Sequence, residues 1–198
     1  MTEPSENKQD LNWPYWLLFA LLATFSALAL FSATAGSFFH IPQNFNEGWN
    51  AYFADAAWSG TLYHPPDGMV TNNYPPLSYY LIGALSRWFG DPIFIGRLLS
   101  AGGLLAVAVN IYAILRIARV EKYMALSVAV AFPGFVAIGF PSYVATNAPQ
   151  WLAHGVMTTG LTLFVIGYRR PGTLVLAAVL MLAAGLIKHN LLPVPLAV

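Results

Sequence analysis

The chain has 198 residues, of which 58% are hydrophobic and only 9% are charged, and its formal net charge is +1. A soluble domain carries about 25% charged residues, so this composition excludes an ordinary soluble protein. The absence of cysteine excludes disulfides, thiol catalysis and cysteine-based zinc sites.

The apolar runs predict a multi-pass membrane protein. A helix needs roughly 20 mostly apolar residues to cross the hydrocarbon core, and residues 15–34 meet this requirement without a charge. Runs at 98–115, 123–140 and 152–168 come close to it, the run at 173–187 is shorter, and 191–198 resembles the beginning of another run. The first run is too long for a cleavable signal peptide, and acidic residues precede it.

The distribution of positive charge predicts the orientation. Five cations fall in the two short loops that follow the second and fourth runs: Arg116, Arg119, Lys122, Arg169 and Arg170. Short loops rich in lysine and arginine remain in the cytoplasm. We therefore expect a cytoplasmic tail at residues 1–12, a membrane domain at 13–198 and a first outer loop at about 37–92, with the chain in the plasma (inner) membrane.

The first outer loop contains two predicted helices. Residues 45–58 place aromatic side chains at helical spacing, which favours an amphipathic helix lying on the outer membrane surface, aromatic side down, and ended by Gly60. Turn-forming residues fill 61–74, and Pro75-Pro76 suits the first turn of a second helix at 77–89. Gly90-Asp91-Pro92 breaks that helix before the second membrane run.

Glu47 is the first charged residue after Asp10, and it lies just past the first membrane run. A carboxylate at a membrane boundary suits an enzyme that uses a lipid-borne substrate. The alternative is structural: Asn44 with a glutamate three residues later is a capping-box pattern, in which Glu47 would only start the helix. The two roles are compatible, because a glutamate fixed at a helix start is also pre-oriented.

Other polar residues near the membrane runs have two interpretations each. A histidine one turn into a membrane run, His154, favours a polar cavity or an interhelical hydrogen bond. Lys188 suits either a snorkelling cation or a charge placed for a lipid phosphate, with Arg87 and Arg97 as rivals for the phosphate. Tyr74, ahead of Pro75-Pro76, suits packing in a tight turn.

Several functional classes have no support in the sequence. It contains no glycine-rich phosphate loop with a Lys-Ser/Thr pair, no Gly-x-Ser-x-Gly and no His-Glu-x-x-His. No basic patch with interleaved aromatic residues indicates nucleic acid.

A series of segments in order resembles a known family. The segments are Asn46-Glu47-Gly48-Trp49-Asn50, Gly60-Thr61-Leu62-Tyr63, Asn73-Tyr74-Pro75-Pro76-Leu77, Gly96-Arg97-Leu98-Leu99-Ser100, Asn147-Ala148-Pro149-Gln150 and Gly185-Leu186-Ile187-Lys188-His189-Asn190. Together they resemble the dolichyl/polyprenyl-phosphate-mannose protein mannosyltransferase superfamily, whose members are multi-pass glycosyltransferases of the GT-C fold class.

The resemblance implies an all-α helical bundle, a polyprenyl-phosphate-linked sugar as donor, and an acceptor glycan, lipid or protein that approaches from outside. It implies Glu47 as the catalytic general base. Together with the place of His154 in its membrane run, it leads us to expect substrate binding by Asn46, Tyr74, Arg97, Asn147, Gln150, His154 and Lys188. Asn46 and Asn147 are amides where the family has acids, which weakens any divalent-metal site and leaves a metal cofactor unassigned. Members are usually much longer, so we expect this chain to be the N-terminal portion of such an enzyme.

Three functions follow as hypotheses. The first is a glycosyltransferase in which Glu47 deprotonates an acceptor hydroxyl and polyprenyl phosphate leaves with inversion. The second is a non-catalytic membrane protein of the same fold that binds a lipid-linked glycan or a partner subunit, which the two amides favour. The third is a transporter fragment with His154 and Lys188 along its pathway.

Overall fold

The computed structural model describes residues 13–64 and 71–197, and within these ranges the regular structure is entirely helical. The helices are α1 (Trp13–Thr34), α2 (Phe45–Trp58), α3 (Leu77–Phe89), α4 (Pro92–Ile117), α5 (Lys122–Gly139), α6 (Gln150–Gly167), α7 (Pro171–Ile187) and α8 (Pro193–Leu196), with short 3₁₀ turns η1 (Pro141–Tyr143) and η2 (His189–Leu191). The tail expected at residues 1–12 lies outside the described residues.

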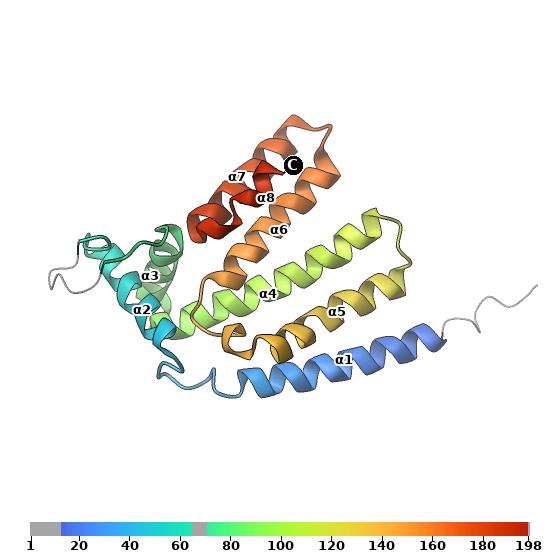
Figure 1. The fold of residues 1–198 in the computed structure, drawn as a ribbon, viewed down its shortest axis with the longest axis horizontal. Helices are drawn as coiled ribbons and strands as arrows, with labels where there is room; N and C mark the ends of the chain where they lie inside the picture. The colour runs from blue at the N-terminus through green and yellow to red at the C-terminus, as the bar shows by residue number, and fades with distance from the viewer. Residues whose placement is uncertain (1–12, 65–70, 198) are drawn as a thin grey trace, which may run out of the picture.

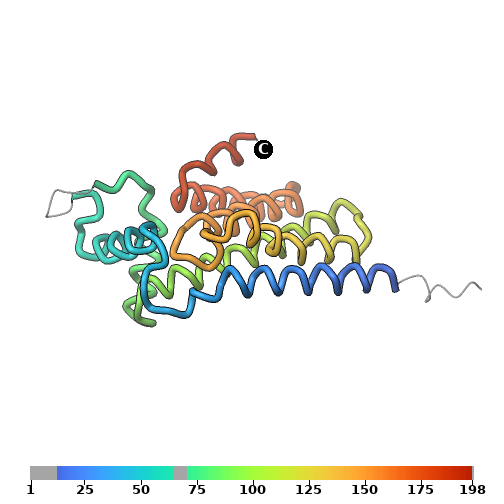
Figure 2. The backbone as a smooth tube through the Cα atoms, turned by 60° about the horizontal axis from the view of Figure 1, so that its bottom comes forward, coloured from blue at the N-terminus to red at the C-terminus, as the bar shows by residue number. Residues whose placement is uncertain are grey.

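Five long helices stand side by side in the order α1, α5, α4, α6, α7, since each neighbouring pair in this order is in contact. Along the chain these five helices alternate in direction, so that α1 and α5 run parallel to each other, as do α4 and α6, while α2 and α3 gather at one end of the bundle (Figure 1). Figure 2 shows the same arrangement from another side, with α1 along the edge of the bundle.

Three helices, α1, α4 and α5, are long and apolar enough to cross a membrane. This is the pattern of a helical membrane protein. Outward-facing leucine and phenylalanine side chains cover α1, of whose residues only Ser26 is buried. The shorter α7 is also apolar, whereas His154, Thr158 and Thr159 make α6 more polar. Membrane crossing by α6 and α7 stays a prediction.

The two helices of the outer loop have the predicted bounds, and local signals explain them. Asn44 caps α2 by accepting a hydrogen bond from the Glu47 amide at 3.1 Å, and Gly60 follows its end with φ +75°. The second membrane helix begins earlier than residue 98, at Pro92, because Asp91 caps it by accepting from the Ile93 amide at 2.8 Å.

The predicted orientation of α2 is wrong for part of its apolar stripe. Phe53 is fully buried and its ring packs against that of Tyr79 on α3. Ala56 and Ala57 are buried in the same cluster, with Trp49 beside it. This part of the stripe faces α3 because the outer loop builds a small core of its own. Phe45, Tyr52 and Trp58 are exposed, so they are available to lipid or water.

Candidate functional site

Two polar features lie at the end of the bundle where α2 and α3 gather. One is a buried ion pair between Glu47 and Arg97. The other is a pocket in front of it, lined by α2, the loop before α6, the loop before α3 and the residue after α7. The sequence-predicted residues divide between the two features.

The carboxylate of Glu47 is completely buried and both of its oxygens are occupied. Arg97 donates from Nε to Oε1 at 2.8 Å and from Nη2 to Oε2 at 2.7 Å. The backbone amides of Gln43 and Asn147 donate to Oε2 and Oε1 at 2.6 and 2.7 Å. A bidentate arginine pair with two further amides is a strong, directional arrangement.

These contacts also set the charge of Glu47. Burial by itself would raise the pKa of the carboxyl group, but the hydrogen bonds from Arg97, Gln43 and Asn147 outweigh it and hold the pKa below its ordinary value. A general base needs a lone pair that can reach a substrate proton. The contacts therefore favour the structural interpretation of Glu47, and its catalytic role stays a prediction.

Arg97 joins Glu47 to the end of α1. Its guanidinium also donates to the carbonyl oxygens of Ser37, Phe39 and Ile41. With all its donors directed into the chain, Arg97 is absent from the lining of the pocket. A phosphate role for this arginine has no support in the geometry.

Asn147 connects the buried pair of Glu47 and Arg97 to the pocket. Its side-chain amide donates to the backbone oxygen of Glu47 at 3.2 Å, and its own carbonyl accepts from the Asn50 side chain at 2.6 Å. Ala145, two residues earlier, has φ +48°, an unusual conformation for a residue with a β-carbon. Ser37 holds that residue by donating to its carbonyl at 2.9 Å.

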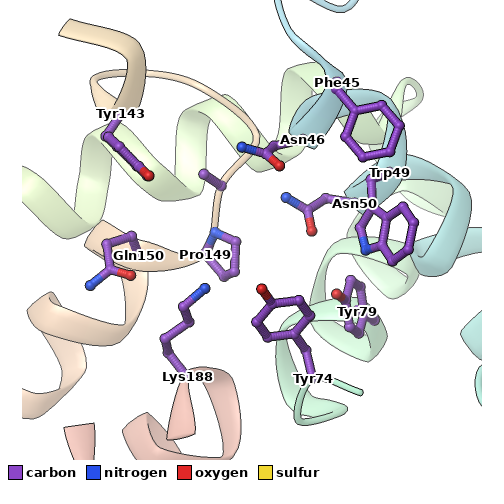
Figure 3. A pocket seen from close by; sticks show the side chains of 11 residues that line it. Phe45, Asn46, Trp49, Asn50, Tyr74, Tyr79, Tyr143, Pro149, Gln150 and Lys188 are labelled. Atoms are coloured by element: carbon purple, nitrogen blue, oxygen red, sulfur yellow. The ribbon is translucent and has the colours of Figure 1, made fainter. Parts of the chain in front are cut away.

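The pocket has a volume of about 260 Å³, and Figure 3 shows it from close by. Its lining combines aromatic rings, amides and one cation: Phe45, Asn46, Trp49, Asn50, Tyr74, Tyr79, Tyr143, Ala148, Pro149, Gln150 and Lys188. The side chains of Asn46, Asn50, Tyr74 and Lys188 point toward its middle (Figure 3). Among residues 13–64 and 71–197, no carboxylate takes part in this lining.

Lys188 reaches the pocket because α7 ends there. The residue has an extended backbone, φ −147° and ψ 108°, so its side chain leaves the helix axis. Its ammonium lies 4.5 Å from the centre of the Tyr74 ring, in a cation–π contact. Burial lowers the pKa of the Lys188 ammonium.

Tyr74 is fixed by its own turn, as expected. Its amide donates to Asn72 Oδ1 at 3.0 Å, and its carbonyl accepts from the Tyr63 hydroxyl at 3.1 Å. The ring is thereby free to line the pocket.

A second pocket, of about 370 Å³, adjoins the first. Tyr143 and Gln150 line both, and Phe140, Trp151 and His154 complete the second. His154 contacts Gln150 on its own helix, Nε2 to Nε2 at 2.7 Å, rather than a neighbouring helix. A polar contact between α4 and α6 is made instead by Asn110 of α4, which donates to Thr159 of α6 at 3.0 Å.

The structure therefore places Asn46, Tyr74, Gln150 and Lys188 in the lining of the first pocket and His154 in that of the second. Glu47, Arg97 and Asn147 are buried and line neither pocket. Sequence reasoning missed Asn50, Tyr79 and Tyr143. Asn50 could have been found, because it lies one turn after Asn46 on the same face of α2. Tyr79 and Tyr143 depend on contacts between distant segments.

Within residues 13–64 and 71–197, no group of three or more His, Asp or Glu side chains could hold a metal ion. The chain matches no protein-family model, curated protein or solved structure in the comparisons made.

Proposed function

We propose that the first pocket binds a sugar carried on a polyprenyl phosphate, at the outer face of the membrane, as the donor site of a membrane glycosyltransferase. The observation that carries the proposal is a half-buried cation, Lys188, which faces amide side chains and aromatic rings across one pocket.

The lining suits the two parts of such a ligand. A phosphate needs a compensating charge, and a partly buried ammonium supplies a charge-assisted hydrogen bond. The amides of Asn46, Asn50 and Gln150 offer donors and acceptors to sugar hydroxyls. The rings of Trp49 and Tyr74 offer apolar faces on which a sugar ring can stack.

The position of the pocket also supports the proposal. It lies at one end of the apolar helices, where a lipid-borne headgroup would emerge from the bilayer. The cation-rich turns after α4 and α6 lie at the opposite end (Figure 1). With those turns in the cytoplasm, the pocket faces outward, in accord with the plasma-membrane location expected from the sequence.

A second candidate is binding without catalysis. No carboxylate lines either pocket in the described part of the chain, and Glu47 is held by Arg97 behind the wall. In this alternative the protein retains or presents a lipid-linked glycan. Both candidates share the same binding step, so one experiment tests their common basis.

The experiment measures the affinity of the full chain, in lipid nanodiscs, for a short-chain prenyl-phosphate hexose. Replacing Lys188 with methionine keeps the length of the side chain and removes its charge. A hydrogen bond to a charged group contributes about 1.5–3 kcal/mol, so Lys188→Met should weaken binding about tenfold to 100-fold. The matched control is Lys122→Met, an exposed lysine at the start of α5, at the opposite end of the bundle.

Unchanged affinity in Lys122→Met alongside the loss in Lys188→Met supports the proposal. Equal affinities in the parent and both variants, or no binding by the parent, would contradict it.

A further inference from the structure

Two side-chain amides in the lining of the first pocket are held by their nitrogen atoms. Asn50 on α2 donates from Nδ2 to the backbone oxygen of Asn147 at 2.6 Å. Gln150, the first residue of α6, places its Nε2 at 2.7 Å from Nε2 of His154, one turn later on the same helix. Because each nitrogen is committed to the protein, each of these amides has its oxygen to offer to a ligand in the pocket.

The contact between Gln150 and His154 also defines the state of the imidazole. The nitrogen of a side-chain amide is a donor only, so Nε2 of His154 accepts the hydrogen bond and carries no proton. The proton of the neutral ring therefore lies on Nδ1. At the pocket, the Gln150 amide turns its oxygen toward the side of Pro149 and its nitrogen away from it (Figure 3).

We propose that His154 is a positioning residue, which holds the Gln150 amide so that its oxygen accepts a hydrogen bond from one hydroxyl group of the bound sugar. The inference rests on the donor site proposed above. It gives that site two fixed acceptors on different elements, Asn50 on α2 and Gln150 on α6. A sugar is then selected by hydroxyl groups that donate to both oxygens.

The rest of the lining agrees with this division of roles. Lys188 is a donor only and suits the phosphate. Among the residues that the structure describes, no carboxylate lines the pocket, so the fixed amide oxygens supply acceptors for sugar hydroxyls. An amide that is free to rotate can meet a donor with its oxygen or an acceptor with its nitrogen. A fixed oxygen rejects a group that cannot donate, because the buried acceptor is then left without a partner.

Fluorinated sugars test this difference, since fluorine in place of a hydroxyl group cannot donate. The affinities of the full chain in lipid nanodiscs are measured for a short-chain prenyl-phosphate hexose and for analogues that each have one hydroxyl replaced by fluorine. The parent should bind two of the analogues about threefold to tenfold more weakly than the hexose, because each loses one hydrogen bond.

In His154→Leu, one of these two losses of affinity should disappear, since the Gln150 amide is then free to turn its nitrogen toward the fluorine. The other loss should remain, because Asn50 is still held by the backbone of Asn147. His154→Gln places an amide oxygen near the position of Nε2 and should retain both losses. His64→Leu, at an exposed loop histidine that lines neither pocket, is the matched control and should also retain both.

The outcomes separate this inference from the proposed function. Both losses retained in His154→Leu, or equal weakening of the hexose and all analogues in that variant, would overturn the positioning role and leave the donor site standing. A parent that binds every analogue as tightly as the hexose would overturn it as well. No binding of the hexose by the parent would instead overturn the donor site itself.

Discussion

At the scale of single residues, the buried pair between Glu47 and Arg97 is the main electrostatic feature of the chain. Removing two charges from water is costly, and the pair repays this through two short hydrogen bonds and the surrounding backbone groups. The ion pair holds neighbouring residues in place. Glu47 holds the Asn147 amide, and Asn147 holds Asn50 at the pocket wall.

The first prediction concerns the loss of that charge. Glu47→Gln leaves the guanidinium of Arg97 buried without its counter-ion, so the free energy of unfolding should fall by about 3–5 kcal/mol. Asp55→Asn, an exposed carboxylate on the same helix, is the control and should change stability little. Denaturant titration in mild detergent measures both. An equal effect of the two variants would exclude the proposed role of the pair.

The pH dependence of stability gives a second prediction. The pKa of Glu47 is lower in the folded chain than its unfolded value of about 4.3. A carboxyl group of this kind stabilises the fold above the unfolded pKa, and the stabilisation is lost as pH falls through the folded pKa. The melting temperature of the parent should therefore fall below about pH 4 more steeply than that of Glu47→Gln. Parallel curves would contradict this assignment.

At the scale of elements, the start of α4 packs against the loop that precedes α6. Gly96 permits this contact: a β-carbon at its position would lie 1.8 Å from Oδ1 of Asn147, a residue that is completely buried. The close approach lets Arg97, the next residue, reach Glu47. A small residue is thus required at position 96 for Arg97, Glu47 and Asn147 to come together.

The third prediction follows from that contact. Gly96→Ala forces Asn147 to move and should destabilise the fold by about 1–3 kcal/mol, the usual effect of overpacking. The matched control is Gly102→Ala in the same helix, where an added β-carbon would have no neighbouring atom within 4 Å. This change should leave the free energy of unfolding unchanged or raise it by up to about 1 kcal/mol. Thermal melting of both variants measures the difference, and matching melting temperatures would show that the loop has room to move.

Local signals were sufficient to predict α2 and α3, because Asn44, Gly60 and the two prolines mark their ends. The direction of the aromatic stripe on α2 could not be predicted, since a helix with aromatic residues on one face fits a membrane surface as well as a protein neighbour. Phe53 faces α3, and only the contact with Tyr79 decides this. The partner of Arg97 was missed for the same reason, because Glu47 lies 50 residues away in the chain.

At the scale of the whole molecule, the two ends of the bundle differ in chemistry. One end has the cationic turns, and the other has the outer-loop helices (Figure 1). The residues that line both pockets and form the ion pair belong to the second of these ends. Apolar runs and loop charges predicted a helical membrane protein whose first loop, at about 37–92, faces outward. The pockets themselves could not be predicted, since each brings together side chains from segments far apart in the sequence.

The fourth prediction concerns this orientation. The natural chain has no cysteine, so single cysteines can be introduced at two exposed positions, Asp55 on α2 and Ala118 at the end of α4. An impermeant thiol reagent applied to intact cells should label Asp55→Cys and spare Ala118→Cys. Labelling after permeabilisation confirms that both thiols react, and the reverse pattern in intact cells would place the pockets on the cytoplasmic side.

The central claim is that the first pocket holds the sugar of a lipid-phosphate donor, and photo-crosslinking tests it most directly. A short-chain prenyl-phosphate hexose with a diazirine on the sugar is bound to the full chain, irradiated and mapped by mass spectrometry. The account predicts adducts on the segments that line the pocket, residues 45–50 and 143–150, and competition by the unmodified compound. Adducts confined to the exposed faces of α1 and α5, or adducts that the competitor does not reduce, would contradict it.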